Sequence, residues 1–210
     1  MAGVSSSDPI FLFFNILSLL IIIGLVISVH EAAHAYVANL RGDPTARLMG
    51  RMTLNPIAHV DPLGTIVVPL LLLVFGGFIF GWAKPTPVNP LNFHSPRRDS
   101  AVVAFAGPVS NFLLAIAFAG FFRIFQYSLL ANVVQLNLML GIFNLIPVPP
   151  LDGSKVLMGF LPRGAAASFA ALEAQGPVFL MVFLLFFIFF FSQPLGTAIS
   201  FLTSLLIGAS

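Results

Sequence analysis

His30, Glu31 and His34 form the pattern His-Glu-x-x-His near the end of a long apolar stretch. Histidines four positions apart lie on one face of a helix, so their imidazoles can hold a single metal ion. A carboxylate beside such an ion can take a proton from an attacking water and return it to the leaving amine of a cleaved peptide bond. These three residues therefore predict a hydrolytic metal centre with Glu31 as its general base.

Asp152 is the best candidate for a third ligand, because catalytic zinc usually has three protein ligands and two histidines leave one missing. It follows Pro147–Pro150 (PVPP), which interrupts an apolar stretch because prolines remove amide donors and clash with the preceding helical turn. The alternative is that Asp152 only caps a helix starting at Ser154. The missing ligand favours the metal role, and since the chain has no cysteine, zinc held by imidazole and carboxylate is expected.

Three motifs resemble the site-2 protease family of intramembrane zinc metalloproteases. They are HEAAH at residues 30–34, AGPVSN at Ala106–Asn111 and FNLIPVPPLDG at Phe143–Gly153, in the family's order and with similar spacing. The resemblance runs from about His30 to Leu157. The stretches GDPT and LNP at residues 42–45 and 54–56 are similar to compact members that lack PDZ and CBS domains.

This resemblance implies roles for five residues. His30, His34 and Asp152 would bind one zinc ion per chain, Glu31 would be the catalytic acid/base, and Asn144 would orient or polarise the substrate carbonyl. The implied substrates are transmembrane proteins, such as anti-sigma factors in bacteria, or remnant signal peptides.

The composition predicts that the lipid bilayer is the solvent. Hydrophobic residues make up 59% of the chain and charged residues only 8%, against about 25% charged in soluble domains. Ile10–Val29, Val102–Phe122 and Gly176–Ser210 carry no charged side chain and reach the ~20 residues that a spanning helix needs. The nine Lys and Arg residues are scattered, which argues against nucleic acid as a partner.

We therefore expect an all-α polytopic membrane protein with about five to six transmembrane helices. A single domain, 1–210, would comprise a catalytic core at about 10–161 and a C-terminal helical hairpin at about 175–210. The first helix would continue to about Arg41, where Gly-Asp-Pro ends it. Further helices are predicted at Ser100–Phe122 and Leu130–Ile146.

The two halves of the metal site constrain the topology. His30 and Asp152 must reach the same depth, so their helices should run in the same direction with an odd number of crossings between them. Leu63–Phe80, which contains Pro69 and a Gly-Gly pair, is therefore predicted to be a re-entrant hairpin. The prolines of Gly81–Pro90 favour extended backbone, which could offer a strand edge to an unwound substrate.

The basic residues then predict the orientation. All but Arg123 fall on one side of the membrane, which is cytoplasmic by the excess of Lys and Arg. The N-terminus would lie outside and the active site would open towards the cytoplasm, in the cytoplasmic membrane of a bacterium.

Alternatives remain for the function and for two loop residues. A divalent-metal transporter also needs intramembrane His and Asp, but Glu31 and the lack of further ionisable groups leading away from the site argue against it. An inactive scaffold is a third possibility. His59 and Asp61 could supply an alternative ligand or support one, or they could simply contact backbone or water in a polar loop.

Overall fold

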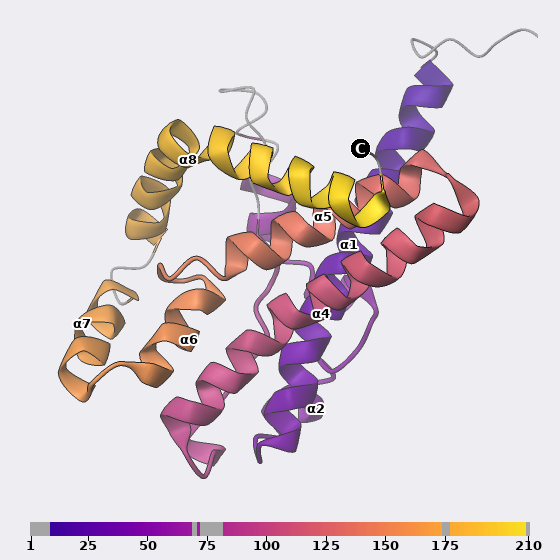
Figure 1. Ribbon diagram of the computed structural model, residues 1–210. Helices are drawn as coiled ribbons and strands as arrows, with labels where there is room; N and C mark the ends of the chain where they lie inside the picture. The colour runs from indigo at the N-terminus through magenta and orange to yellow at the C-terminus, as the bar shows by residue number, and fades with distance from the viewer. Residues whose placement is uncertain (1–8, 69–70, 72–81, 174–176, 209–210) are drawn as a thin grey trace, which may run out of the picture.

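A computed structural model of the chain describes residues 9–68, 71, 82–173 and 177–208 (Figure 1). Within these residues the protein is helical and contains no strand, as expected for the all-α class. Phe13–Leu40, Pro96–Phe125 and Phe189–Ile207 are long and apolar enough to cross a membrane, and Ser128–Asn144 is a shorter apolar helix. The described helices thus provide three candidate spans, fewer than the five to six that were predicted.

Helix α1 (Pro9–Leu40) carries the His-Glu-x-x-His motif and ends one residue before the predicted boundary. Gly42 follows in a left-handed conformation, with a φ of 107°, which favours glycine. Asp43 then accepts a hydrogen bond from the Thr45 main-chain N–H, where α2 (Thr45–Leu48) begins. The predicted Gly-Asp-Pro stop is therefore confirmed.

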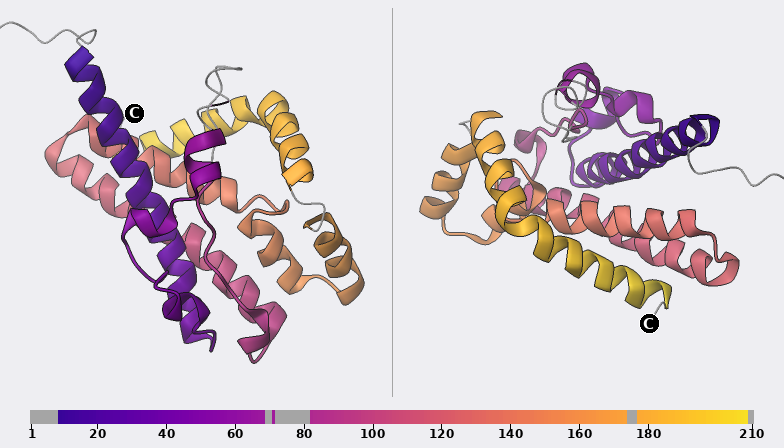
Figure 2. Two further views of the ribbon diagram at one scale, coloured as in Figure 1. Left: turned by 180° about the vertical axis from the view of Figure 1, so that it is seen from behind. Right: turned by 90° about the horizontal axis from the view of Figure 1, so that it is seen from above.

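Helix α4 (Pro96–Phe125) lies at the centre of the fold. It packs against α1, α5 (Ser128–Asn144) and α6 (Asp152–Phe160). Seen from above, α1 lies on one side of α4 and α5, and α8 lies on the other (Figure 2). Among the described residues, the larger apolar core joins α4, α5 and α8. Its buried members are Ala115, Ala119, Val134, Leu138 and Ile199.

The proline-rich break after α5 occurs where the sequence predicts it. Helix α5 ends at Asn144, and α6 begins at Asp152 after a series of turns. Gly153 is required here, because a Cβ at this position would overlap the Leu145 carbonyl. This close approach sets the position of the Asp152 side chain at the start of α6.

The C-terminal part differs from the predicted hairpin. After α7 (Arg163–Glu173), the residues from Pro177 to Ile207 form one helix, α8, which bends sharply (Figure 1). Pro194 lies inside this helix. A proline removes one amide donor and displaces the preceding helical turn. It can therefore bend a helix that nevertheless continues beyond it.

Residues 41–95 connect α1 to α4 through short elements: η1 (Pro56–His59), η2 (Pro62–Val67, a π-helical turn) and η3 (Pro90–Asn92). Residues 82–89 form neither helix nor strand, in agreement with the extended backbone that their prolines favour. The predicted re-entrant hairpin at Leu63–Phe80 lies largely outside the described residues, so it stays a prediction.

Candidate metal centre

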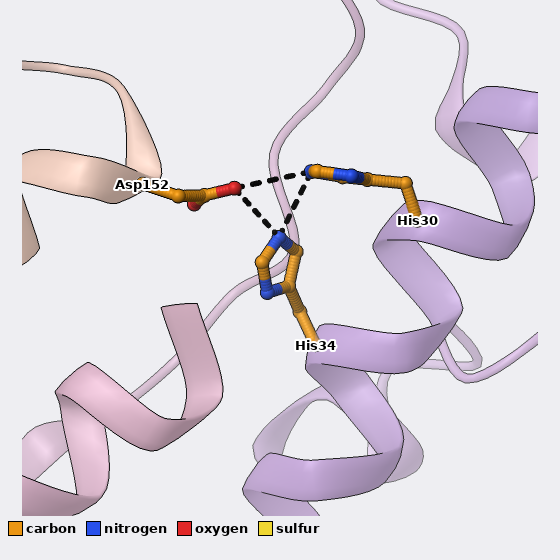
Figure 3. Close-up of side chains that lie close together, drawn as sticks. All are labelled: His30, His34 and Asp152. Carbon is orange, nitrogen blue, oxygen red and sulfur yellow. Dashed lines mark hydrogen bonds and ion pairs between the residues drawn. The ribbon is translucent and has the colours of Figure 1, made fainter. Parts of the chain in front are cut away.

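Helices α1 and α6 bring His30, His34 and Asp152 together, although more than a hundred residues separate them in the chain (Figure 3). The Nε2 atoms of both histidines lie 3.2 Å from Oδ2 of Asp152. The two Nε2 atoms are 3.0 Å apart. Both histidines are buried, so the three predicted ligand groups converge on one enclosed point.

The second nitrogen of each ring determines which tautomer is present. His30 Nδ1 lies 2.6 Å from Oδ1 of Asn111, and His34 Nδ1 lies 2.7 Å from the Val103 carbonyl oxygen. A carbonyl oxygen only accepts hydrogen bonds, so both Nδ1 atoms carry the proton. Each Nε2 therefore presents a lone pair to the centre.

With both rings neutral, three lone pairs face one another at this point. Oδ2 of Asp152 is buried and accepts no hydrogen bond. Protonating both Nε2 atoms as well would place two hydrogens between nitrogens 3.0 Å apart and two positive charges in a buried site. A cation at the centre removes this conflict, and two imidazoles with one carboxylate are a donor set typical of catalytic zinc.

Gly107 of α4 makes room for the histidine pair. A Cβ at this position would overlap Nε2 of His34 and would lie 2.6 Å from Cε1 of His30. The side chains that it accommodates are the predicted metal ligands themselves.

Asn111 continues the network away from the site. Its Nδ2 donates to Oδ1 of Asn137 over 3.1 Å, and Nδ2 of Asn137 donates to the Val133 carbonyl. Both asparagines are fully buried. The contact of Asn111 with His30 and the role of Asn137 were not predicted from the sequence. A polar residue in a predominantly apolar helix was the available signal for Asn137.

Glu31 follows His30 on α1 and is half-buried. Its Oε2 accepts a hydrogen bond of 2.8 Å from the Thr86 main-chain N–H. The general base predicted from the motif is thus attached to the extended segment 82–89.

Comparison with known proteins identifies the family. Peptidase family M50 matches residues 18–135 and 123–189, which together cover most of the chain. The chain belongs to this family. The resemblance of its motifs to the site-2 proteases is thereby confirmed.

Individual relatives of this M50 protein carry names that agree. "Putative zinc metalloprotease YwhC" of Bacillus subtilis is 43% identical over 195 residues, which are 84% of this chain and 82% of that protein. "Putative zinc metalloprotease Rip2" of Mycolicibacterium smegmatis is 29% identical over 80% of this chain and 67% of that protein. "Zinc metalloprotease MJ0392" of Methanocaldococcus jannaschii is 27% identical over 72% of this chain and 36% of that protein. No solved structure was found to match.

Asn144 of the M50 chain is the last residue of α5 and is half-buried. Its Nδ2 donates to the Leu140 carbonyl within the same helix, over 3.0 Å. This contact holds the amide group at the helix end and uses one of its two N–H donors, which leaves the second for another acceptor. The role in orienting a substrate carbonyl stays a prediction.

His59 and Asp61 do not belong to the ligand cluster found among the described residues. His59 is buried and its Nε2 donates to the Thr53 carbonyl over 2.9 Å. Asp61 caps η2 by accepting hydrogen bonds from the main-chain N–H groups of Leu63 and Gly64. Both residues make the backbone contacts of a polar loop, which was the simpler of the two interpretations.

Proposed function

We propose that this M50 protein is an intramembrane zinc endopeptidase that hydrolyses peptide bonds within or near the transmembrane segments of membrane proteins. One observation carries the proposal: three lone pairs converge on a buried point at His30 and His34, inside a helix that is long and apolar enough to cross a membrane. Burying these polar groups at such depth is costly unless a cation compensates them. A site of this kind serves chemistry on substrates within the bilayer.

His30, His34 and Asp152 would hold one zinc ion per chain. A bound zinc ion supplies Lewis acidity, which polarises a carbonyl group and eases the loss of a proton from water. Glu31 takes the proton from the attacking water as the new C–O bond forms. It returns this proton to the leaving nitrogen as the C–N bond breaks. Asn144 orients the substrate carbonyl with its amide group.

The distribution of charge supports the proposed orientation. The C-terminal end of α1, helix α2 and the N-terminal end of α4 gather at the bottom of Figure 1, while the turn between α4 and α5 lies far from them. Arg41, Arg47 and Arg97 lie at the end formed by α1, α2 and the start of α4, whereas Arg123 lies just before the turn between α4 and α5. The basic end would face the cytoplasm of a bacterium and the N-terminus would lie outside.

Substrates would be single-span membrane proteins, such as anti-sigma factors, or remnant signal peptides. A metal transporter would need further ligand groups leading across the membrane. Among the described residues, His30, His34 and Asp152 are the only cluster of three or more His, Asp or Glu side chains that could hold an ion. The peptidase is therefore the better supported of the two functions.

The test is to measure the zinc content of the purified protein and its cleavage of a panel of single-span substrates, with Glu31→Gln as the comparison. We expect the variant to keep its zinc and to lose cleavage, because Glu31 moves the proton without holding the metal. A wild-type protein that binds zinc but cleaves no substrate, and that carries zinc into sealed vesicles, would establish the transporter instead.

A further inference from the structure

Thr86 contacts Glu31 at two points. Its main-chain N–H donates to Oε2 of Glu31 over 2.8 Å, and its hydroxyl donates to the Glu31 carbonyl oxygen over 3.0 Å. Fifty-five positions separate the two residues in the chain, so the tertiary fold alone creates these contacts. We propose that Thr86 positions the Glu31 carboxylate for proton transfer; this inference rests on the proposed peptidase function.

A glutamate that acts as a general base needs such support. Its side chain has several rotatable bonds, and fixing a side chain of this length costs up to about 2 kcal/mol of conformational entropy. Proton transfer requires the carboxylate to lie within hydrogen-bond reach of the reacting water. A main-chain N–H is a fixed donor, and its bond to a carboxylate is of the stronger, charge-assisted kind. Holding Oε2 in this way leaves Oε1 to take the proton.

The amide donors around Thr86 are used inside the chain. Trp82 N–H donates to the Gly64 carbonyl over 3.1 Å, and Lys84 N–H donates to the His59 carbonyl over 2.9 Å. Alternate residues of an extended chain face the same side, so the donors of 82, 84 and 86 form one edge of this segment. On the opposite edge, Pro85 and Pro87 have no N–H to offer.

The strand edge that the sequence suggested for substrate stays a prediction. The N–H groups of Trp82, Lys84 and Thr86 are used inside the chain, and Pro85 and Pro87 have none. We therefore assign residues 82–89 to holding the catalytic base in place. The prolines fit this role, since they stiffen the backbone on both sides of Thr86.

Two anchors fix the segment on either side of Thr86. The buried Arg51 guanidinium donates to the Lys84 carbonyl over 2.7 Å and also reaches the Pro85 carbonyl. Beyond Thr86, the Asn89 main-chain N–H donates to Oδ2 of Asp43 over 2.7 Å. With both ends attached to the loop after α1, the Thr86 N–H has little freedom to leave Glu31.

The experiment compares three substitutions at this position by cleavage of a model single-span substrate. Thr86→Pro removes the N–H and the hydroxyl, Thr86→Val removes the hydroxyl alone, and Thr86→Ser keeps both donors. Thr65→Val is the matched control, because it deletes a hydroxyl that donates to the Trp82 carbonyl without contacting Glu31. Zinc content and thermal unfolding are measured for every variant.

We expect kcat of Thr86→Pro to fall by about 100-fold, the lower end of what general acid–base catalysis contributes, with KM and zinc content unchanged. The kcat of Thr86→Val should lie between those of Thr86→Pro and the wild type, and the kcat of Thr86→Ser and of the Thr65→Val control should resemble that of the wild type. A kcat equal to that of the wild type in Thr86→Pro would overturn the proposal. A higher KM with unchanged kcat would do so too, because segment 82–89 would then bind substrate.

If Thr86→Pro does not fold, the α-hydroxy acid counterpart of threonine at position 86 replaces the N–H by an ester oxygen with almost no change in shape. The same fall in kcat is expected, and a normal kcat would overturn the proposal. Failure of the peptidase function looks different, because the wild type itself would then cleave nothing.

Discussion

His30 and His34 differ in the group that holds their second ring nitrogen. The Val103 carbonyl that binds His34 belongs to the main chain and cannot be removed by substitution, whereas the Asn111 carboxamide that binds His30 can. Both acceptors keep the proton on Nδ1 and direct Nε2 at the metal position. Asn111 is therefore the place where tautomer control can be tested.

Replacing Asn111 by leucine should lower zinc affinity by about 10- to 100-fold, since His30 loses the acceptor that fixes its ring. Asn111→Asp keeps an acceptor for His30 but loses the donor to Asn137, so it should retain much more of the affinity. Competition with a chromophoric zinc chelator measures the zinc affinity of both variants. Equal losses in the two variants would mean that Asn111 acts through packing between α4 and α5.

At the scale of elements, α4 contains two glycines with different surroundings: Gly107 contacts the histidine rings, and Gly120 has open space around it. Gly107→Ala should reduce zinc content and destabilise the fold by about 1 to 3 kcal/mol, because its Cβ would overlap the ligand rings. Gly120→Ala is the control on the same helix, where a Cβ meets no atom within 4 Å. Thermal unfolding should show it neutral or slightly more stable, and an equal loss in both variants would contradict this account.

Asp43 joins three elements at the end of α1. Its carboxylate accepts hydrogen bonds from Thr45, from the Asn89 main-chain N–H and from the Asn92 amide. Burial would raise the pKa of this carboxyl group, but these hydrogen bonds outweigh burial and hold the pKa below its usual range. The folded state therefore binds the proton less readily than the unfolded state does.

A lowered pKa predicts how stability depends on pH. The contribution of Asp43 is fully present above the ordinary carboxyl pKa of about 4 and is lost as the pH falls through the lower pKa of the folded state. Asp43→Asn should cost about 2 kcal/mol near neutral pH, since an amide cannot accept from all these donors. The gap in unfolding temperature between wild type and variant should narrow below about pH 4; a constant gap would contradict the assignment.

For the whole molecule, Arg123, the one basic residue predicted to lie on the other side of the membrane, has a structural use in the last turn of α4. Arg123 donates to the Leu205 and Leu206 carbonyls at the C-terminal end of α8. A positive charge is favourable at this end of a helix. Arg123 therefore does not weaken the orientation inferred from the other basic residues.

That orientation can be tested directly because the chain has no native cysteine. Met49 and Tyr127 are 62% and 67% exposed. Met49 follows α2 and Tyr127 lies in the turn between α4 and α5, which are far apart in Figure 1. In intact cells, a membrane-impermeant maleimide should label Tyr127→Cys and should leave Met49→Cys unlabelled until the membrane is permeabilised. The reverse pattern would place the active site on the outer side.

Much of this fold could be predicted from local sequence. The course of α1, its stop at Gly42, the interruption after Asn144 and the candidate ligands His30, His34 and Asp152 all follow from side-chain spacing and from prolines within a few residues. The continuous, bent helix α8 could not be predicted from local sequence, because Pro194 is compatible with either a break or a bend in the helix. Packing of α8 against α5 decides between the two.

The sequence by itself determined the donor chemistry of the site, since a cysteine-free chain with this histidine spacing leaves few other uses for these residues. Only the tertiary structure assigned Asn111, Asn137, Val103 and Thr86 to the support of the ligands and the base. These contacts join residues between 26 and 81 positions apart. No local pattern encodes such pairs, because they depend on how closely α1, α4 and α5 approach one another and on where the loop after α1 passes.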